Sequence, residues 1–124
     1  MVNLIKDNER GDLIAFNTMD IPFYVKRIFV VDVEKESNRG FHAHFYCHQF
    51  LICLKGGVVL ELHNGKEKET IYLNKGNYYH INPMIWAHQE YLNNSMLMVL
   101  CSHEYDKEDY ITDFEEFKRL TNGN

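Results

Sequence analysis

The segment Arg39-Gly40-Phe41-His42-Ala43-His44 decides how this sequence of 124 residues is interpreted. Its two histidines are two residues apart, so they lie on one face of a strand, where side chains alternate between faces. A third histidine, His48, follows four residues after His44 and shares that face if the strand continues. An acid–base pair or a metal site requires imidazoles that converge in this way. We therefore predict the functional site on this strand.

Short strands separated by turn sequences are predicted on both sides of the histidines. Lys55-Gly56-Gly57 and Asn64-Gly65 are turn signals, and the second is typical of a two-residue hairpin loop. Strands that recur about every 8–12 residues indicate a sandwich or a barrel. We expect strands at residues 12–16, 25–33, 41–47, 49–54, 58–63, 66–73, 78–81, 85–91 and 96–102.

Only the C-terminal part of the sequence follows a helical pattern. Residues 109–120 place apolar side chains at helical spacing with charged side chains around them, and the apolar ones are Tyr110, Ile111, Phe114, Phe117 and Leu120. This pattern predicts a short C-terminal helix that packs on the barrel. The sequence contains no repeat, low-complexity segment or linker, so we expect a single domain over residues 1–124.

The composition limits which kinds of partner the protein is expected to bind and where in the cell it is expected to be found. The net charge of −5 argues against a non-specific nucleic-acid surface, although a few local arginines can still bind a small anion. The three cysteines lack the CxxC spacing of a zinc knuckle, and their odd number argues against a disulfide framework. The first ten residues lack an apolar signal-peptide core, and no apolar run approaches the ~20 residues that span a bilayer. We expect a soluble, cytoplasmic protein with no membrane segment.

The histidine pattern resembles the two sequence motifs of the cupin superfamily. Gly-x-His-x-His-x-x-x-His over residues 40–48 is similar to the first motif, in which an acidic residue normally stands at the position of His48. Pro83 followed by His88 is similar to the second motif, which supplies one further histidine. The resemblance implies an all-β cupin fold, a double-stranded β-helix or jelly-roll barrel, to which the short C-terminal helix is added.

Two interpretations of the histidines remain open from the residues alone. In the first, a divalent metal such as Zn, Ni, Cu or Fe is bound by four histidines, namely His42, His44, His48 and His88. In the second, His42 and His44 move protons on a bound carbonyl substrate without a metal, because imidazole titrates near neutral pH. A purely structural role in a wet barrel mouth ranks behind both.

The resemblance becomes specific at residues 39–44. This segment is similar to the signature of the dTDP-4-keto-6-deoxy-glucose 3,4-ketoisomerases, the sugar ketoisomerase branch of the cupins. Further segments resemble the same family in the same order, and the likeness runs from about residue 10 to residue 120. These segments are residues 21–23, 26–27, 51–56, 83–87, 99–102 and 105–111.

The resemblance implies a metal-independent isomerase that uses no cofactor. Its substrate is a dTDP-linked 4-keto-6-deoxyhexose, and its product is the 3-keto sugar formed through an enediol. Such a shift of a carbonyl group needs at least two titratable groups near adjacent carbons. We therefore assign His42 and His44 as the catalytic proton-transfer pair.

Arg27, Arg39 and Trp86 are the candidate substrate-binding residues. Negative charge that develops on the substrate oxygen needs a cation or a donor, and a guanidinium also fits a diphosphate. Arg27 and Arg39 are candidates for either role, with a rim salt bridge to Glu34 or Glu36 as the structural alternative. Trp86, the single tryptophan, either packs in the barrel core or stacks on the base or sugar.

The resemblance also implies partners and rivals. A homodimer is expected, and the 3-keto product would pass to a PLP-dependent aminotransferase that makes a 3-amino-3,6-dideoxyhexose for surface glycans.

One alternative function is that of a 3,5-epimerase on the same nucleotide sugar, which is expected to use a His–Asp dyad and a tyrosine acid in a longer chain. Another is a non-catalytic cupin that binds metal or sugar, and a metal-dependent dioxygenase is a third. The short chain and the paired histidines favour the isomerase.

Overall fold

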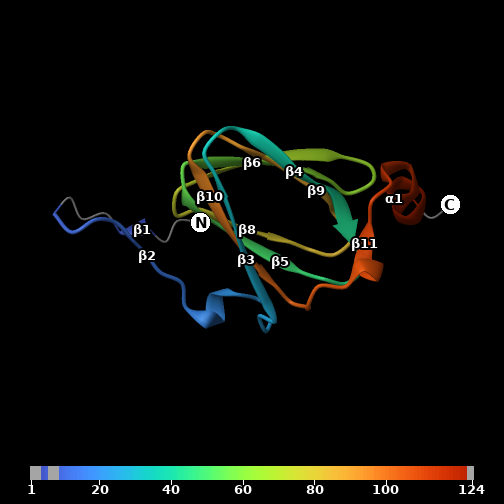
Figure 1. Ribbon diagram of the computed structural model, residues 1–124. Coiled ribbons are helices and arrows are strands. Elements are labelled where there is room, and N and C mark those ends of the chain that lie inside the picture. The colour runs from blue at the N-terminus through green and yellow to red at the C-terminus, as the bar shows by residue number, and fades with distance from the viewer. Residues whose placement is uncertain (1–3, 6–8, 123–124) are drawn as a thin grey trace.

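Two antiparallel β-sheets face each other and form a barrel in the computed structural model, which describes residues 4–5 and 9–122 (Figure 1). The first sheet has the order β3 (Arg27–Val33), β10 (Ser95–Cys101), β5 (Gln49–Lys55), β8 (Tyr78–Ile81). The second has the order β11 (Tyr110–Ile111), β4 (Ser37–His44), β9 (Trp86–Tyr91), β6 (Gly57–His63), β7 (Lys68–Asn74). The predicted all-β barrel is therefore confirmed.

Shorter elements flank the barrel. β1 (Leu4–Ile5) pairs with β2 (Leu13–Ile14), and the 3-10 turn η1 (Thr18–Asp20) follows them. After β10 come the 3-10 turn η2 (Lys107–Asp109), β11 and the C-terminal helix α1 (Phe114–Thr121). In Figure 1, β1 and β2 lie at one end of the molecule and α1 lies at the other. Within the described residues, no helix combines the length and the apolar content that crossing a bilayer requires.

β5 has a continuous apolar run because the side chains on both of its faces are buried. Leu51 and Cys53 point into the core between the sheets, whereas Phe50 and Ile52 pack under the N-terminal segment on the outer face. Phe16 of that segment makes an edge-to-face contact with Phe50, with ring centres 5.9 Å apart. A strand between two apolar layers needs a continuous apolar run, because both sets of alternating side chains are buried.

The strand that carries the paired histidines ends earlier than predicted. β4 stops at His44, and residues 45–48 cross from the second sheet to β5 in the first. The amide of His48, at the end of this connection, donates a hydrogen bond of 2.8 Å to Oγ of Ser102. The strand does not continue through His48, so the condition under which His48 would share a strand face with His44 is not met.

The C-terminal helix is also shorter than predicted. The carboxylate of Asp113 accepts a hydrogen bond of 3.0 Å from the amide of Glu115, and this N-cap starts α1 at Phe114. The preceding residues, predicted as helix from residue 109, form η2 and β11 instead, and β11 pairs with β4. The change matters for the site, because it brings Asp109 beside the strand that carries the histidines.

A bulge in β4 controls where the strand residues after it point. Gly40 lies opposite His88 of β9, whereas His42 lies opposite Ala87, so Phe41 is an extra residue in β4. Gly40 has a φ of +100°, and a Cβ atom there would lie only 3.0 Å from the carbonyl oxygen of Ala87. Glycine alone accepts both this backbone conformation and this close approach.

Replacing Gly40 by alanine is expected to lower the free energy of unfolding by about 2 kcal/mol or more. The substitution adds backbone strain and a close contact with β9. Gly11→Ala is the matched control, because Gly11 has a similar φ of +93° but nothing within 4 Å of its added Cβ. Urea unfolding of the two variants separates strain from crowding. Equal losses would show that the close approach at the bulge is unimportant.

Candidate active site

A cavity of about 600 Å³ lies between the two sheets. Its volume falls in the range of roughly 300–1,000 Å³ that is usual for small-molecule sites. Three of the residues predicted for the site line this cavity, namely Arg27, Arg39 and His42. The other polar side chains that line the cavity are Gln49, Gln89, Tyr91 and Tyr110. The sequence analysis did not predict them as site residues.

His42 and His44 lie together on the inner face of β4. Their ring centres are 5.1 Å apart in an edge-to-face arrangement. Tyr110 of β11 packs against both, with its ring centre 4.9 Å from that of His42 and 4.4 Å from that of His44. Ala43 between them faces the opposite way, into the cluster under α1 that includes Phe117. The alternation of the strand thus brings the two imidazoles together.

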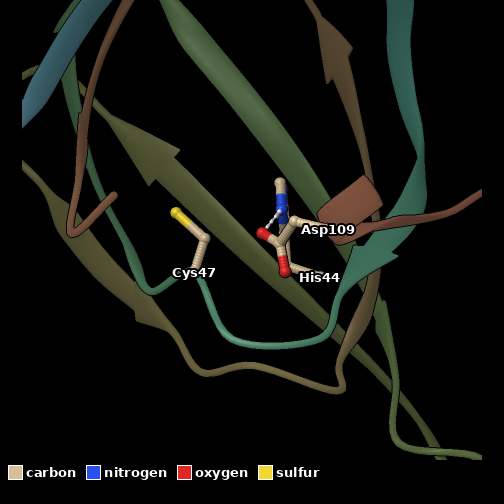
Figure 2. A group of neighbouring side chains, drawn as sticks. All are labelled: His44, Cys47 and Asp109. Atoms are coloured by element: carbon tan, nitrogen blue, oxygen red, sulfur yellow. Dashed lines mark hydrogen bonds and ion pairs between the residues drawn. The ribbon is translucent and has the colours of Figure 1, made fainter. Parts of the chain in front are cut away.

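Asp109 is the hydrogen-bond partner of His44 (Figure 2), and it was not among the predicted site residues. Nδ1 of His44 lies 2.8 Å from Oδ2 of Asp109, and these side chains are only 9% and 3% exposed. Oδ1 of Asp109 accepts a hydrogen bond of 2.8 Å from the amide of Tyr46. A carboxylate fixed in this way favours the tautomer of His44 with its proton on Nδ1. Nε2 of His44 is then the basic nitrogen, and it is buried with no partner among the described residues.

His42 is a neutral imidazole at pH 7. Burial, followed by the effect of the neighbouring His44, lowers the pKa of His42 from 6.5 to about 4. Nδ1 of His42 is also buried with no hydrogen-bond partner among the described residues. Buried polar atoms are normally hydrogen-bonded, so two unpartnered nitrogens on neighbouring imidazole rings indicate a site for a ligand.

The lowered pKa of His42 is expected to make the folded protein less stable in acid. The unfolded chain takes up a proton at His42 near pH 6.5, but the folded chain does so only near pH 4. The stabilisation is therefore complete above pH 6.5 and is lost as the pH falls toward 4, and it amounts to about 3 kcal/mol. Urea unfolding at neutral pH and near pH 4 should show a smaller loss in His42→Asn than in wild type. Identical losses would contradict a neutral His42.

Arg27 lies beside Tyr110 at the wall of the cavity. Its guanidinium is 4.8 Å from the ring centre of Phe29 and 5.5 Å from that of Tyr105. Burial raises the pKa of Tyr110, and the neighbouring Arg27 acts in the opposite direction. The two aromatic rings hold the guanidinium while its charge remains available to an anion in the cavity.

Arg39 lies near Tyr91 on a second wall. Burial raises the pKa of Tyr91 to about 12, with Arg39 acting in the opposite direction. The alternative role for Arg39, a rim salt bridge to Glu34 or Glu36, is not formed among the described residues. Both predicted arginines therefore lie at the wall of the cavity.

Trp86 does not line the cavity, and the structure corrects the prediction that it contacts substrate. Its ring centre lies 5.2 Å from that of Phe114 and 5.8 Å from that of Phe117, in the cluster under α1. Its neighbour Ala87 points into the core between the sheets, so alternation along β9 directs Trp86 to the outer face. Its role is to pack α1 onto the barrel.

His48 and His88 do not join the paired histidines. Nδ1 of His48 lies 3.0 Å from Nε2 of His80 in β8. The ring of His88 stacks on Phe41 at 4.4 Å, and its Nε2 lies 3.7 Å from Oε1 of Glu90. Among the described residues, the group that comes within metal-binding reach contains neither of them. The four-histidine metal site is therefore not assembled.

A family model described as "FdtA: WxcM-like, C-terminal" matches residues 1–122. The chain belongs to this FdtA family. A relative from Aneurinibacillus thermoaerophilus, a TDP-4-oxo-6-deoxy-alpha-D-glucose-3,4-oxoisomerase, is 35% identical over 118 residues, which cover 90% of this chain and 84% of the relative. The resemblance to the sugar 3,4-ketoisomerases is thereby confirmed.

Solved structures of 3,4-ketoisomerases are also similar to this chain. A 3,4-ketoisomerase from Helicobacter canadensis is 34% identical with a TM-score of 0.85, over 98% of this chain and 93% of that one. A variant of the 3,4-ketoisomerase QdtA from Thermoanaerobacterium thermosaccharolyticum, in complex with TDP-4-keto-6-deoxyglucose, is 31% identical. Its TM-score is 0.83, over 98% of this chain and 91% of that one.

Proposed function

We propose that this chain is a nucleotide-sugar 3,4-ketoisomerase. It converts a dTDP-linked 4-keto-6-deoxyhexose to the 3-keto isomer and needs neither metal nor cofactor. The observation that carries the proposal is the pair of imidazoles, with His44 held by Asp109 and His42 lining the cavity between the sheets. The activity of the relative from A. thermoaerophilus and the ligand of the QdtA complex support the same reaction and substrate.

His44 is the base in the proposed mechanism. Because Asp109 holds the proton on Nδ1, Nε2 is free to take the proton from C3, the carbon next to the ketone. The electron pair of the C3–H bond forms a C3–C4 double bond, and the C4 oxygen gains the negative charge of an enediolate. The carboxylate of Asp109 stabilises the imidazolium that forms on His44.

The charge on the C4 oxygen needs a hydrogen-bond donor. His42 supplies a ring N–H, since its lowered pKa keeps it neutral, and Tyr110 lies against both imidazoles with a phenol that stays protonated. A proton donated to the C4 oxygen by one of these groups gives the enediol. Delivery of a proton to C4 and loss of the proton on the C3 hydroxyl, which returns to that donor, then move the carbonyl group to C3. Protons taken and given are equal in number, so no redox cofactor is required.

Arg27 and Arg39 are proposed to bind the diphosphate of the substrate. Both line the cavity, and a guanidinium pairs with phosphate oxygens through two parallel hydrogen bonds. This anchoring fixes the sugar relative to the imidazoles without using either histidine for binding.

We also propose a homodimer and a downstream amino transfer. Ile28 and Val30 on the outer face of β3 are 60% and 50% exposed, and such apolar side chains support contact with a second copy of the chain.

A 3-keto sugar is the substrate that a PLP-dependent aminotransferase needs to make a 3-amino-3,6-dideoxyhexose. The cytoplasmic location and the single domain over residues 1–124 stay predictions.

The test is turnover of dTDP-4-keto-6-deoxyglucose by protein treated with EDTA and then dialysed. NMR of the sugar is expected to show the 3-keto product at the same rate before and after chelation. A rate that disappears with EDTA and returns only with added metal would overturn the metal-independent mechanism. A sugar that is bound but never converted would support the non-catalytic alternative.

A further inference from the structure

The proposed base, His44, lies close to two other side chains that commonly bind metals, Cys47 and Asp109 (Figure 2). His44, Cys47 and Asp109 each offer one ligand atom, and these atoms all lie within 4.8 Å of one another. All three residues are buried, and they line one small cavity of about 10 Å³. That volume is about the space of one water molecule or one metal ion. Neither Cys47 nor Asp109 belongs to the histidine motif, so the fold itself assembles this group.

We propose that this cluster binds a thiophilic divalent cation such as Zn²⁺ and that the bound cation inhibits the enzyme. One imidazole nitrogen, one thiolate and one carboxylate oxygen form a donor set that suits Zn²⁺, whereas Mg²⁺ and Ca²⁺ select oxygen ligands. Three protein ligands leave the fourth tetrahedral position for water. The set differs from the four-histidine site expected from the sequence, because it keeps only His44.

The geometry requires two adjustments, the larger at Cys47. Two ligand atoms on one zinc ion lie roughly 3.3–3.7 Å apart, so the 2.8 Å between Nδ1 of His44 and Oδ2 of Asp109 must open slightly. The widest separation, within 4.8 Å, must close by about 1 Å. The thiol of Cys47 now donates to the carbonyl oxygen of His48 at 3.3 Å, and a rotation of its short side chain exchanges that weak bond for the metal. The thiol proton passes to solvent as the zinc–sulfur bond forms.

The charges around the small cavity favour a cation on balance. Arg27 lines it and opposes a second positive charge. Three carboxylates line the same cavity, and they belong to Glu104, Asp106 and Asp109. The acidic groups thus outnumber the arginine, which lowers the cost of placing a divalent ion there.

Inhibition follows from the tautomer of His44. A cation that takes Nδ1 replaces the proton shared with Asp109, and the neutral ring must then carry its proton on Nε2. Nε2 can no longer accept the proton of C3. The inhibition therefore rests on the proposed function, whereas the binding of the cation does not.

Cobalt(II) is the probe for binding, because a cobalt–thiolate bond gives a near-ultraviolet charge-transfer band. EDTA-treated, dialysed protein titrated with Co²⁺ is expected to develop this band, and added Zn²⁺ is expected to remove it by displacement. The band should be lost in Cys47→Ser and kept in Cys53→Ser, which changes a buried free thiol outside the cluster. Asp109→Asn, which keeps the shape of the side chain, should weaken the band.

The results of the metal titration test the cation site independently of the proposed function. No band in wild type, or an equal band in Cys47→Ser, would overturn the cation site whatever the protein catalyses. Equimolar Zn²⁺ is expected to remove most of the turnover of wild type, and EDTA is expected to restore it. Cys47→Ser, compared with its own rate without metal, should be far less sensitive. Full turnover of wild type with Zn²⁺ bound would overturn the inhibition.

Discussion

Turnover of the His44→Asn variant is expected to fall by about three orders of magnitude, with KM little changed. Asparagine has no nitrogen that can take a proton from carbon at neutral pH, so the step at C3 loses its base. The arginines that line the cavity are untouched, so binding of the nucleotide sugar should persist. Steady-state formation of the 3-keto product, with circular dichroism as a check on folding, measures the effect.

His48→Asn is the matched control for this experiment. The same chemical change is made four residues away, at a side chain whose Nδ1 pairs with His80 and not with Asp109. Its rate should stay within about twofold of wild type. Near-normal rates in His44→Asn, or equal losses in the two variants, would show that the base has been wrongly assigned.

Asp109→Asn is expected to lower kcat by about a hundredfold while KM stays within a few-fold of wild type. The carboxylate accepts two hydrogen bonds, from Nδ1 of His44 and from the amide of Tyr46. A carboxamide has only one accepting oxygen, so its NH₂ group must face one of these two donors. If it faces His44, Nδ1 must become the acceptor and the proton moves to Nε2.

The tautomer of His44 is the readout that distinguishes positioning from a structural effect. Nitrogen-15 NMR of the imidazole should show the proton on Nδ1 in wild type and on Nε2 in Asp109→Asn. Asp113→Asn is the control, because it makes the same change at the N-cap of α1, where asparagine caps as well as aspartate. An unchanged tautomer together with normal kcat in Asp109→Asn would contradict a positioning role.

The barrel and the histidine pair could be predicted because their signals are local. A turn at Asn64-Gly65 separates β6 from β7 as predicted, although the loop has the four residues 64–67 and not two. The strand period of two places His42 and His44 on one face. The end of β4 was not predictable in this way. Its last residue depends on the crossing from one sheet to the other, and the hydrogen bond from His48 to Ser102 that holds the crossing spans 54 residues.

Asp109 was missed because its role depends on tertiary structure. Tyr110 and Ile111 fit a helical stripe as well as they fit a strand, and only the pairing of β11 with β4 decides between them. Tyr110 lies opposite His44 in that pairing, which places Asp109 next to the imidazole. The misplacement of Trp86 has a similar origin, since nothing in the sequence tells which face of β9 the helix α1 covers.

The pair formed by His44 and Asp109 affects the choice between a ketoisomerase and a 3,5-epimerase. A dyad of this kind was expected in a 3,5-epimerase, and the structure contains one between His44 and Asp109, with Tyr110 beside it. The dyad alone therefore does not separate the two activities, because both include the loss of the C3 proton next to the C4 ketone. The two reactions differ in their later steps, since an epimerase also exchanges the proton at C5 and leaves the ketone at C4.

The central claim is tested most directly with dTDP-4-keto-6-deoxyglucose carrying carbon-13 at C4, incubated with EDTA-treated protein in deuterated water. We predict that the carbon-13 signal moves from the ketone region to the alcohol region while the proton at C5 is retained. A signal that stays in the ketone region, with deuterium appearing at C3 and C5, would contradict the isomerase and identify an epimerase instead.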